Sequence, residues 1–291
     1  MRSLLFVPGD SEKKLEKGIA SETDVLIVDL EDSVAPSNKE AGRNITAAFI
    51  RERRQDVRAA IFVRVNDLSS GLTDADLAAV MSARPEGIML PKSNGEADIS
   101  ALSLRLRVHE AEHGIADGAT KIIPIITETG TGVLAASTYR ANPRLAGLTW
   151  GAEDLSAAIG ARSARDDHGN YTDVFRLARA LTILAASAAD TMAVDTVFPN
   201  FRDEAGFAAE CQAAERDGFV AKMAIHPAQV AVINAAFTPS AEAVEKSKAV
   251  VAAFAAAGNP GVVAIDGKMY DRPHLRLAER LLARARAAGV A

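Results

Sequence analysis

Three carboxylates lie within four residues at the end of an apolar run in the stretch VLIVDLEDS, residues 25–33. They belong to Asp29, Glu31 and Asp32. Negative charges this close together raise one another's pKa unless a cation or a hydrogen-bond donor lies among them. The cluster therefore favours a cation or donors nearby, although a solvated turn or the acidic first turn of a following helix would also explain it.

The elements that position these carboxylates are predicted from eight short apolar runs rich in Val and Ile. The expected strands cover residues 3–8, 25–30, 60–65, 87–91, 121–127, 147–151, 193–198 and 220–225. Such runs are typical of parallel strands covered on both faces, and the helix-length stretches between them imply right-handed crossovers. The pattern predicts an α/β chain with a (β/α)8 TIM barrel over residues 1–238. A doubly wound open sheet stays an alternative, although no Gly-rich dinucleotide loop follows the first run.

Residues 239–291 exceed what a barrel needs. Two further helices are expected there, over residues 240–258 and 272–289, on either side of the stretch VVAIDGKMYD. This stretch carries Asp266 and Asp271 around a turn-forming Gly267. From the residues alone, we expect a hairpin-like connector in a C-terminal helical extension.

In a (β/α)8 barrel the C-terminal ends of the strands carry the chemistry. The expected ends supply Phe6, Pro8, Gly9, Asp29, Glu31, Asp32, Arg64, Asn66, Lys92, Glu128, Glu153, Asp154, Asp195 and His226. Carboxylates without Cys or clustered His suit a hard cation with oxygen ligands, Mg²⁺ rather than Zn²⁺. Glu128 and Asp154 follow adjacent strands and form a reasonable ligand pair. Arg64 offers a rigid fork for a carboxylate or a developing enolate oxygen.

The remaining composition excludes several classes of protein. The 33 basic and 38 acidic residues give a net charge of −5, which argues against general attraction to nucleic acid or membranes. The single cysteine, Cys211, excludes an intrachain disulfide and a multi-Cys metal site. His109 and His113 are four residues apart in an expected exposed helix, but we find no third ligand for them. A cytoplasmic enzyme or binding protein is expected.

Seven blocks, taken together, resemble the citrate lyase β-subunit-like family. They are RSLLFVPGD, VLIVDLEDSV, FVRVN, GIMLPK, IIPIITETGTGV, GLTWGAEDL and KMAIHPAQVAVIN. The family includes the malyl-CoA lyases and belongs to the wider HpcH/HpaI aldolase group. The resemblance implies a barrel that uses Mg²⁺ to cleave or form a carbon–carbon bond beside a CoA thioester carbonyl. It places the metal ligands on Glu128 and Asp154, and the arginine that holds the substrate on Arg64.

The same resemblance implies roles for residues around the metal and the CoA. Asp29 and Glu31 are expected to accept hydrogen bonds from metal-bound waters. The expected CoA-binding residues are Phe6, Lys13, Lys17, Ile225 and His226. The two lysines are four residues apart and share a helix face, which suits phosphates, although a solvated lysine face would look the same.

The resemblance also implies that Asp271 is the catalytic acid or base and acts in the site of a neighbouring subunit. Tyr270 stands where the family usually has a small aliphatic residue. A homo-trimer, or a hexamer of trimers, is then expected, with the extension packed on a neighbouring subunit. The implied reaction releases an acyl-CoA, such as acetyl-CoA or propionyl-CoA, and a keto acid. Alternatives are a condensing enzyme or malyl-CoA thioesterase of the same family, a citryl lyase subunit acting on an acyl carrier protein, and a non-catalytic barrel that binds CoA esters.

Overall fold

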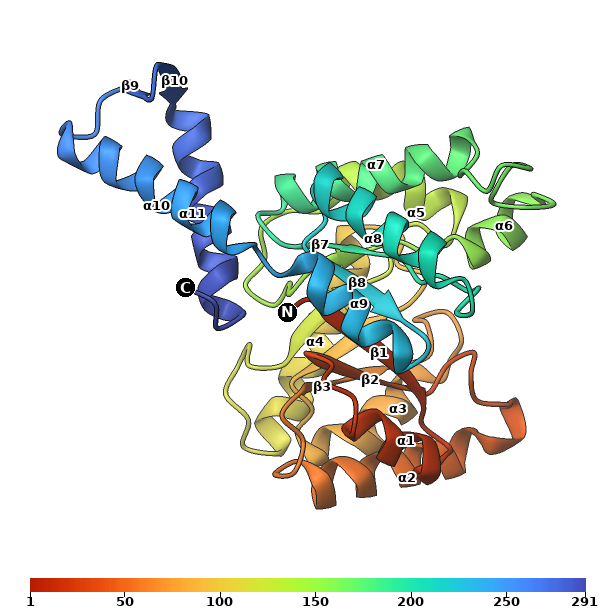
Figure 1. Ribbon diagram of the computed structural model, residues 1–291. Coiled ribbons are helices and arrows are strands. Elements are labelled where there is room, and N and C mark those ends of the chain that lie inside the picture. The colour runs from red at the N-terminus through yellow and green to blue at the C-terminus, as the bar shows by residue number, and fades with distance from the viewer.

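Eight parallel strands form a nearly closed barrel in the computed structural model, which describes residues 1–291 (Figure 1). The strands are β1 (Ser3–Pro8), β2 (Val25–Asp29), β3 (Ala60–Arg64), β4 (Gly87–Leu90), β5 (Lys121–Pro124), β6 (Leu148–Thr149), β7 (Ala193–Asp195) and β8 (Ala221–Ala224). Their order in the sheet is β5-β4-β3-β2-β1-β8-β7-β6, so each strand pairs with its neighbour in sequence except at the seam between β5 and β6, and β8 returns to pair with β1. The predicted (β/α)8 barrel is confirmed, and the doubly wound alternative, which needs a reversal of strand order, is wrong.

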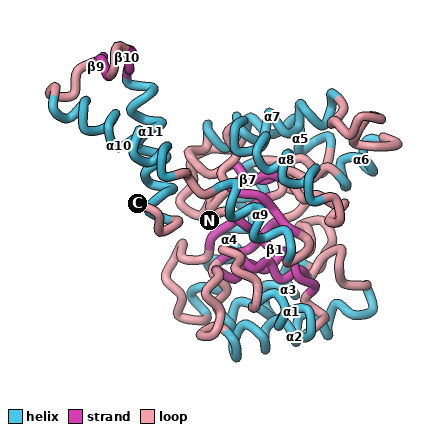
Figure 2. The backbone as a smooth tube through the Cα atoms, viewed as in Figure 1, coloured by secondary structure: helices cyan, strands magenta, loops and turns pink.

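Helices surround the strands on the outside of the barrel (Figure 2). They are α1 (Glu12–Ile19), α2 (Lys39–Arg53), α3 (Thr73–Val80), α4 (Glu96–Glu112), α5 (Gly130–Ala135), α6 (Glu153–Ile159), α7 (Asp173–Ala188), α8 (Glu204–Asp217) and α9 (Ala228–Phe237). Short 3₁₀ turns cover Pro36–Asn38, Met81–Ala83 and Ala136–Thr138. None of the helices is both long and apolar enough to cross a membrane.

The seam between β5 and β6 is the weakest part of the barrel wall. Only isolated bridges join the two sides, Ile122 to Leu145 and Ile125 to Thr149. The expected strand 121–127 ends at Pro124, because proline has no N–H to donate to a ladder. The expected strand 147–151 is reduced to two residues, which pair with β7 but meet the end of β5 only at the isolated bridge between Ile125 and Thr149.

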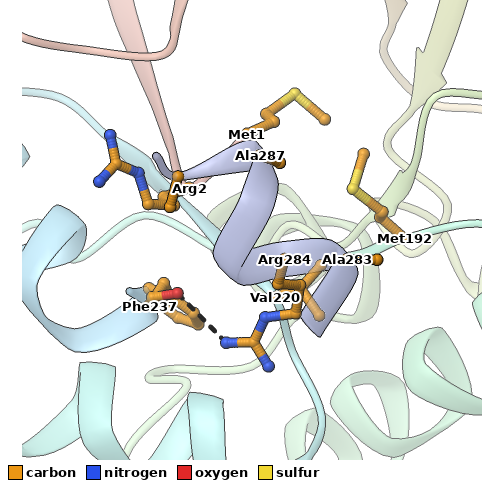
Figure 3. A pocket seen from close by; sticks show the side chains of 9 residues that line it. Met1, Arg2, Met192, Val220, Phe237, Ala283, Arg284 and Ala287 are labelled. Carbon is orange, nitrogen blue, oxygen red and sulfur yellow. Dashed lines mark hydrogen bonds between the residues drawn. The ribbon is translucent and has the colours of Figure 1, made fainter. Parts of the chain in front are cut away.

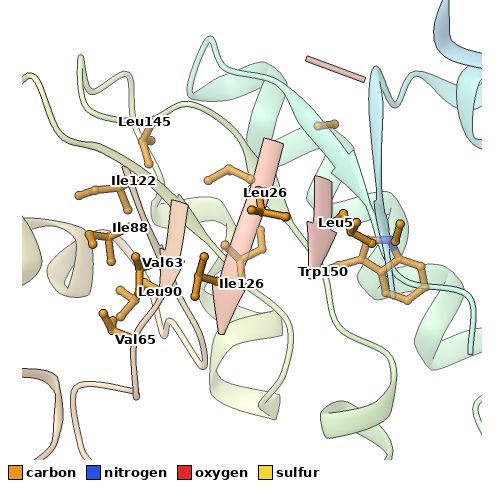
Figure 4. Packing of buried hydrophobic residues seen from close by; sticks show 14 of the residues in the cluster. Leu5, Leu26, Val63, Val65, Ile88, Leu90, Ile122, Ile126, Leu145 and Trp150 are labelled. Carbon is orange, nitrogen blue, oxygen red and sulfur yellow. The ribbon is translucent and has the colours of Figure 1, made fainter. Parts of the chain in front are cut away.

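The two faces of each strand pack into different cores, which follows from the two-residue period of a strand. In β2, Ile27 points into the barrel with Phe62 and Met89, whereas Leu26 packs outward against the helices. Figure 4 shows the outward cluster, with Leu26 among the labelled side chains. Phe62 fills the interior where a Cβ on Gly87 would lie 2.1 Å from its ring, so that position requires glycine.

The same alternation of inward-facing and outward-facing residues positions the side chains of the site. Asp29 lies two residues after Ile27 and Arg64 two residues after Phe62, so both side chains continue the inward-facing rows. These rows end at the C-terminal ends of the strands, here called the mouth of the barrel.

The C-terminal extension is a helical hairpin that projects away from the barrel (Figure 1). It consists of α10 (Ala241–Ala256), β9 (Val262–Ile265), β10 (Lys268–Asp271) and α11 (Arg272–Ala287). The strands pair in antiparallel fashion at its tip, and Asp266 and Gly267 join them with positive φ of 50° and 73°, as a type I′ hairpin turn requires. The expected hairpin-like connector is present.

The base of the extension contacts the end of the barrel opposite the mouth. There the last turns of α11 border a cavity of about 230 Å³ lined by Met1, Arg2, Met192, Val220, Phe237, Ala283, Arg284, Ala287 and Ala288 (Figure 3). Arg284 Nη2 donates to the carbonyl oxygen of Phe237 at 3.2 Å. Met192 and Val220 precede β7 and β8, so this contact lies at the N-terminal ends of the strands.

Candidate active site

Asp29 and Arg64 form the floor of the mouth. They are register partners on β2 and β3, and Arg64 Nε and Nη2 each donate to one Asp29 oxygen at 2.7 Å. The backbone N–H groups of Glu31 and Ser33 donate to the same two oxygens at 2.9 and 3.1 Å. Burial alone would raise the pKa of Asp29, but the charge and hydrogen bonds of Arg64 outweigh it and hold this pKa below its usual value. Asp29 is thus a buried carboxylate with both oxygens engaged by the protein.

Glu31 lies beside this pair and is less well satisfied. Its Oε1 accepts a hydrogen bond from Lys92 Nζ. Its Oε2 lies 2.8 Å from Arg64 Nη1, yet this buried atom receives no properly directed hydrogen bond. Burial raises the pKa of Glu31 by more than Arg64 and Lys92 lower it. One buried oxygen at the mouth therefore still has a free lone pair.

Glu128 and Asp154 come from the two sides of the barrel seam. Glu128 follows β5 and is 3% exposed, whereas Asp154 lies in the first turn of α6 with its side chain 33% exposed. Burial raises the pKa of Glu128 to about 8, and the negative charge of Asp154 adds to the effect. A Cβ on Gly151 would lie 2.8 Å from Glu128 Cγ, so glycine lets the loop before α6 approach this carboxylate.

Lys92 joins the carboxylates from the end of β4. Its backbone N–H donates to Glu128 Oε2, and its Nζ lies 3.7 Å from Asp32 Oδ2 and 3.8 Å from Asp154 Oδ1. Its φ is +52°, the left-handed region that costs a non-glycine residue about 1–3 kcal/mol and persists where the surroundings fix it. The sequence placed Lys92 at a strand end but assigned it no role. The left-handed turn at Lys92 lets this residue contact both Glu128 and Asp154. Apart from the LPK stretch, nothing in the sequence indicates this turn.

An apolar cleft opens beside Arg64. It has a volume of about 300 Å³ and is lined by Phe6, Pro8, Asp29, Ser33, Arg64, Val197 and Ile225. The guanidinium carbon of Arg64 lies 4.9 Å from the centre of the Phe6 ring, within the range of a cation–π contact. The structure therefore brings the predicted residues Phe6 and Ile225 to the same cleft as Arg64.

The other residues predicted for CoA lie outside the cleft. Lys13 and Lys17 are exposed on α1 and make no ion pair. The exposed ring of His226 stacks on Phe201, with centroids 4.9 Å apart, while its backbone N–H donates to Gln229 Oε1 at 3.2 Å. All three remain open to a ligand.

Asp271 is far from these residues in the chain. It is the N-cap of α11 at the tip of the extension, where its Oδ1 accepts from the His274 N–H at 3.4 Å and lies 2.5 Å from His274 Nδ1. The hydrogen bond from the His274 side chain holds the pKa of Asp271 below its usual value. A single chain thus keeps Asp271 ionised and away from its own mouth.

The donor set at the mouth fits Mg²⁺. Glu128 and Asp154 offer carboxylate oxygens on adjacent elements, and burial, together with the negative charge of Asp154, raises the pKa of Glu128. A cation between the two carboxylates would favour the ionised form. Glu31 Oε2 is a buried acceptor that lies 2.8 Å from Arg64 Nη1 but receives no well-directed hydrogen bond, so it can still accept one from a metal-bound water. Mg²⁺ takes one or two carboxylates and keeps several waters.

Comparison with known proteins gives a consistent set of relatives. The family model described as HpcH/HpaI aldolase/citrate lyase matches residues 2–227. The chain is 34% identical over 290 residues to a (3S)-malyl-CoA thioesterase from Cereibacter sphaeroides, covering 98% of this chain and 95% of the relative. It is 32% identical over 294 residues to the mitochondrial citramalyl-CoA lyase of Rattus norvegicus, covering 97% and 85%. A crystal structure of the protein CitE from Mycobacterium tuberculosis, in complex with magnesium, acetoacetate and coenzyme A, is similar with a TM-score of 0.76 and 32% identity over 98% of this chain and 97% of the other.

Proposed function

Because this chain belongs to the HpcH/HpaI aldolase/citrate lyase family, we propose that it is a Mg²⁺-dependent carbon–carbon lyase. Its substrate is the CoA thioester of a hydroxy acid, malyl-CoA-like or citryl-CoA-like, and its products are an acyl-CoA and a keto acid. The observation that carries the proposal is the carboxylate pair Glu128 and Asp154 beside Arg64. Arg64 in turn lines an apolar cleft. The related CitE structure, which holds magnesium, a keto acid and coenzyme A, supports it.

The residues of the mouth divide the work of the reaction. Glu128 and Asp154 hold Mg²⁺, which supplies a Lewis acid for the oxygens of the keto acid. Removal of the β-hydroxyl proton starts the cleavage, the adjacent carbon–carbon bond breaks, and its electron pair moves into the thioester enolate. The hydroxyl carbon becomes the keto carbon of the released acid. Arg64 neutralises negative charge that develops on oxygen, and a proton delivered to the enolate carbon completes the acyl-CoA.

The contacts support different roles for the two acidic residues of β2 and its loop. Glu31 keeps the expected role of accepting a hydrogen bond from a metal-bound water, because its Oε2, although 2.8 Å from Arg64 Nη1, receives no well-directed hydrogen bond. Asp29 accepts four hydrogen bonds from protein groups. We therefore assign Asp29 to fixing the orientation of the Arg64 fork, in place of the contact with metal-bound water expected from the sequence.

Arg64→Lys should lower kcat by at least about 10²-fold, because a point charge cannot reproduce a fork that spans Asp29 and substrate oxygens. Steady-state kinetics at saturating substrate measures this. Near-normal kcat would show that Arg64 only balances the charge of Asp29 and Glu31.

Lys13→Glu combined with Lys17→Glu should raise KM for the CoA ester well above any effect on kcat, because a contact to a remote phosphate contributes equally to ground state and transition state. Lys14→Glu is the matched control, since Lys14 is also exposed on α1 but lies on a different side of the helix. An unchanged KM in the double variant, or an equal rise in the control, would mean that the lysine face is only solvated.

The thioesterase alternative has a specific basis, because one relative is a (3S)-malyl-CoA thioesterase. An assay of malyl-CoA with Mg²⁺ distinguishes the reactions when glyoxylate and free CoA are measured separately. Release of glyoxylate and acetyl-CoA from malyl-CoA supports the lyase. Formation of malyl-CoA from glyoxylate and acetyl-CoA supports the condensing enzyme. Free CoA without glyoxylate contradicts the lyase in favour of the thioesterase. No turnover contradicts the lyase as a free-standing enzyme and leaves a CoA-ester-binding barrel or a subunit that needs an acyl carrier protein.

The assembly remains part of the proposal. We assign residues 1–238 to the catalytic barrel and residues 239–291 to an extension that packs on a neighbouring subunit of a homo-trimer or a hexamer. Exposed apolar side chains support this, since Met269 is 71% and Leu277 65% exposed on the extension. A cytoplasmic location stays a prediction from sequence.

A further inference from the structure

A cluster of metal-ligating side chains lies at the end of α4, apart from the mouth. His109, Glu112 and His113 each offer one ligand atom, and these atoms all lie within 4.8 Å of one another. The sequence pattern offers the two histidines no third ligand, whereas the structure places Glu112 beside both of them. Helical spacing places all three side chains on neighbouring positions of one face.

The geometry of the cluster is close to that of a chelate. His109 Nδ1 is 3.2 Å from Glu112 Oε2, and the two imidazole rings are nearly parallel, with an interplanar angle of 4° and centroids 6.3 Å apart. Ligand atoms around tetrahedral Zn²⁺ lie about 3.4 Å apart, given bonds of about 2.1 Å. Small side-chain rotations therefore bring the three atoms into range, and Glu112 is free to move because its side chain is 57% exposed.

Two further observations favour a cation here. His109 Nδ1 is buried and, although Glu112 Oε2 lies 3.2 Å away, it makes no well-directed hydrogen bond, so its lone pair or proton is left for another partner. The cluster also lies in the last turn of α4, where the exposed carbonyl groups form the negative end of the helix dipole. Arg84 Nη2 donates to the His113 carbonyl oxygen at 2.6 Å and holds this turn in place.

Glu110 restricts what such a site can do. Residues 109–113 read HEAEH, which matches the H-E-x-x-H pattern in which the glutamate serves as general base of a zinc protease. Here Glu110 is 1% exposed, and both its oxygens accept hydrogen bonds from Arg144 at 2.7 Å. It therefore points into the protein and cannot activate a water at the cluster. A hydrolytic role is excluded.

We propose that His109, Glu112 and His113 bind a divalent transition metal of the Zn²⁺ class. Two imidazole nitrogens and one carboxylate suit Zn²⁺ and not Mg²⁺, so this site is distinct from the one at the mouth. The bound ion connects these three side chains in the last turn of α4 and so stabilises the folded chain. It takes no part in catalysis.

The test is a titration of the full-length protein with Zn²⁺ in saturating Mg²⁺, read by a chromophoric competitor and by thermal unfolding. The wild type should bind one Zn²⁺ at this cluster and gain Tm. His113→Gln and Glu112→Gln should each weaken that binding at least about tenfold, since loss of a supporting group near a metal already costs about 10–100-fold. Their lyase activity with Mg²⁺, measured without Zn²⁺, reports that they are folded.

His168→Gln is the matched control, because His168 lies exposed in a loop outside both sites. Asp154→Ala separates this cluster from the carboxylates of the mouth and should keep the zinc equivalent. The inference is overturned by a wild type that binds no Zn²⁺, by unchanged affinity in His113→Gln, or by a zinc equivalent that disappears in Asp154→Ala.

Discussion

Glu128→Ala and Asp154→Ala should each abolish carbon–carbon cleavage and Mg²⁺ binding while the barrel stays folded. The two carboxylates lie on opposite sides of the β5–β6 seam, and each supplies one ligand to the metal. Either substitution therefore removes a ligand that the remaining carboxylate cannot replace. Calorimetric titration with Mg²⁺ measures the binding, and the assay for glyoxylate and acyl-CoA measures the turnover.

Two further variants separate loss of the metal from loss of structure. Glu128→Gln keeps an acceptor for the Lys92 N–H, so it avoids the cost of about 1–3 kcal/mol of an unpaired buried donor. It should remain folded and still fail to bind Mg²⁺. Glu153→Ala is the control for Asp154, because Glu153 is exposed in the same turn of α6. Unchanged Mg²⁺ affinity in both alanine variants would reject the assignment of the ligands.

The strand positions could be predicted because parallel strands buried on both faces leave continuous apolar runs in the sequence. The apolar run predicts a longer β5 than the structure has, since Ile125 and Ile126 extend the run but contact β6 only through isolated hydrogen bonds. Glu128 still lies at the mouth, because the chain continues in the strand direction after Pro124.

The contacts within the mouth could be predicted less well. That Asp29 pairs with Arg64 depends on the register between β2 and β3, and an apolar pattern does not determine register when both strand faces are buried. The contacts of Lys92 depend on the left-handed conformation of its own backbone, and a lysine side chain gives no preference for that conformation. Glu112 was within reach of the sequence, because its spacing from His109 already places it on the same helix face.

Asp271 is too far from the mouth of its own barrel to act there. Its substitution is the second change for which we expect a large loss of activity. The extension is anchored at the opposite end of the barrel, and its helices of 16 residues carry Asp271 outward by about 24 Å (Figure 1). In the isolated chain Asp271 is bonded to His274, and its pKa is lowered. Burial in the mouth of a neighbouring subunit would act in the opposite direction and raise the pKa toward the value that a general acid or base needs.

Asp271→Asn should therefore abolish turnover without unfolding the extension, because asparagine caps a helix as well as aspartate does. Mixing this variant with inactive Glu128→Ala under conditions that exchange subunits should restore activity. With equal amounts and random exchange, about a quarter of the sites combine an intact metal site with a neighbour's intact Asp271. A mixture of Glu128→Ala with Asp154→Ala is the matched control and should stay inactive, because both changes fall in the same barrel. Absence of recovery after verified exchange would reject action in trans, whereas full activity of Asp271→Asn alone would remove Asp271 from the proton transfer altogether.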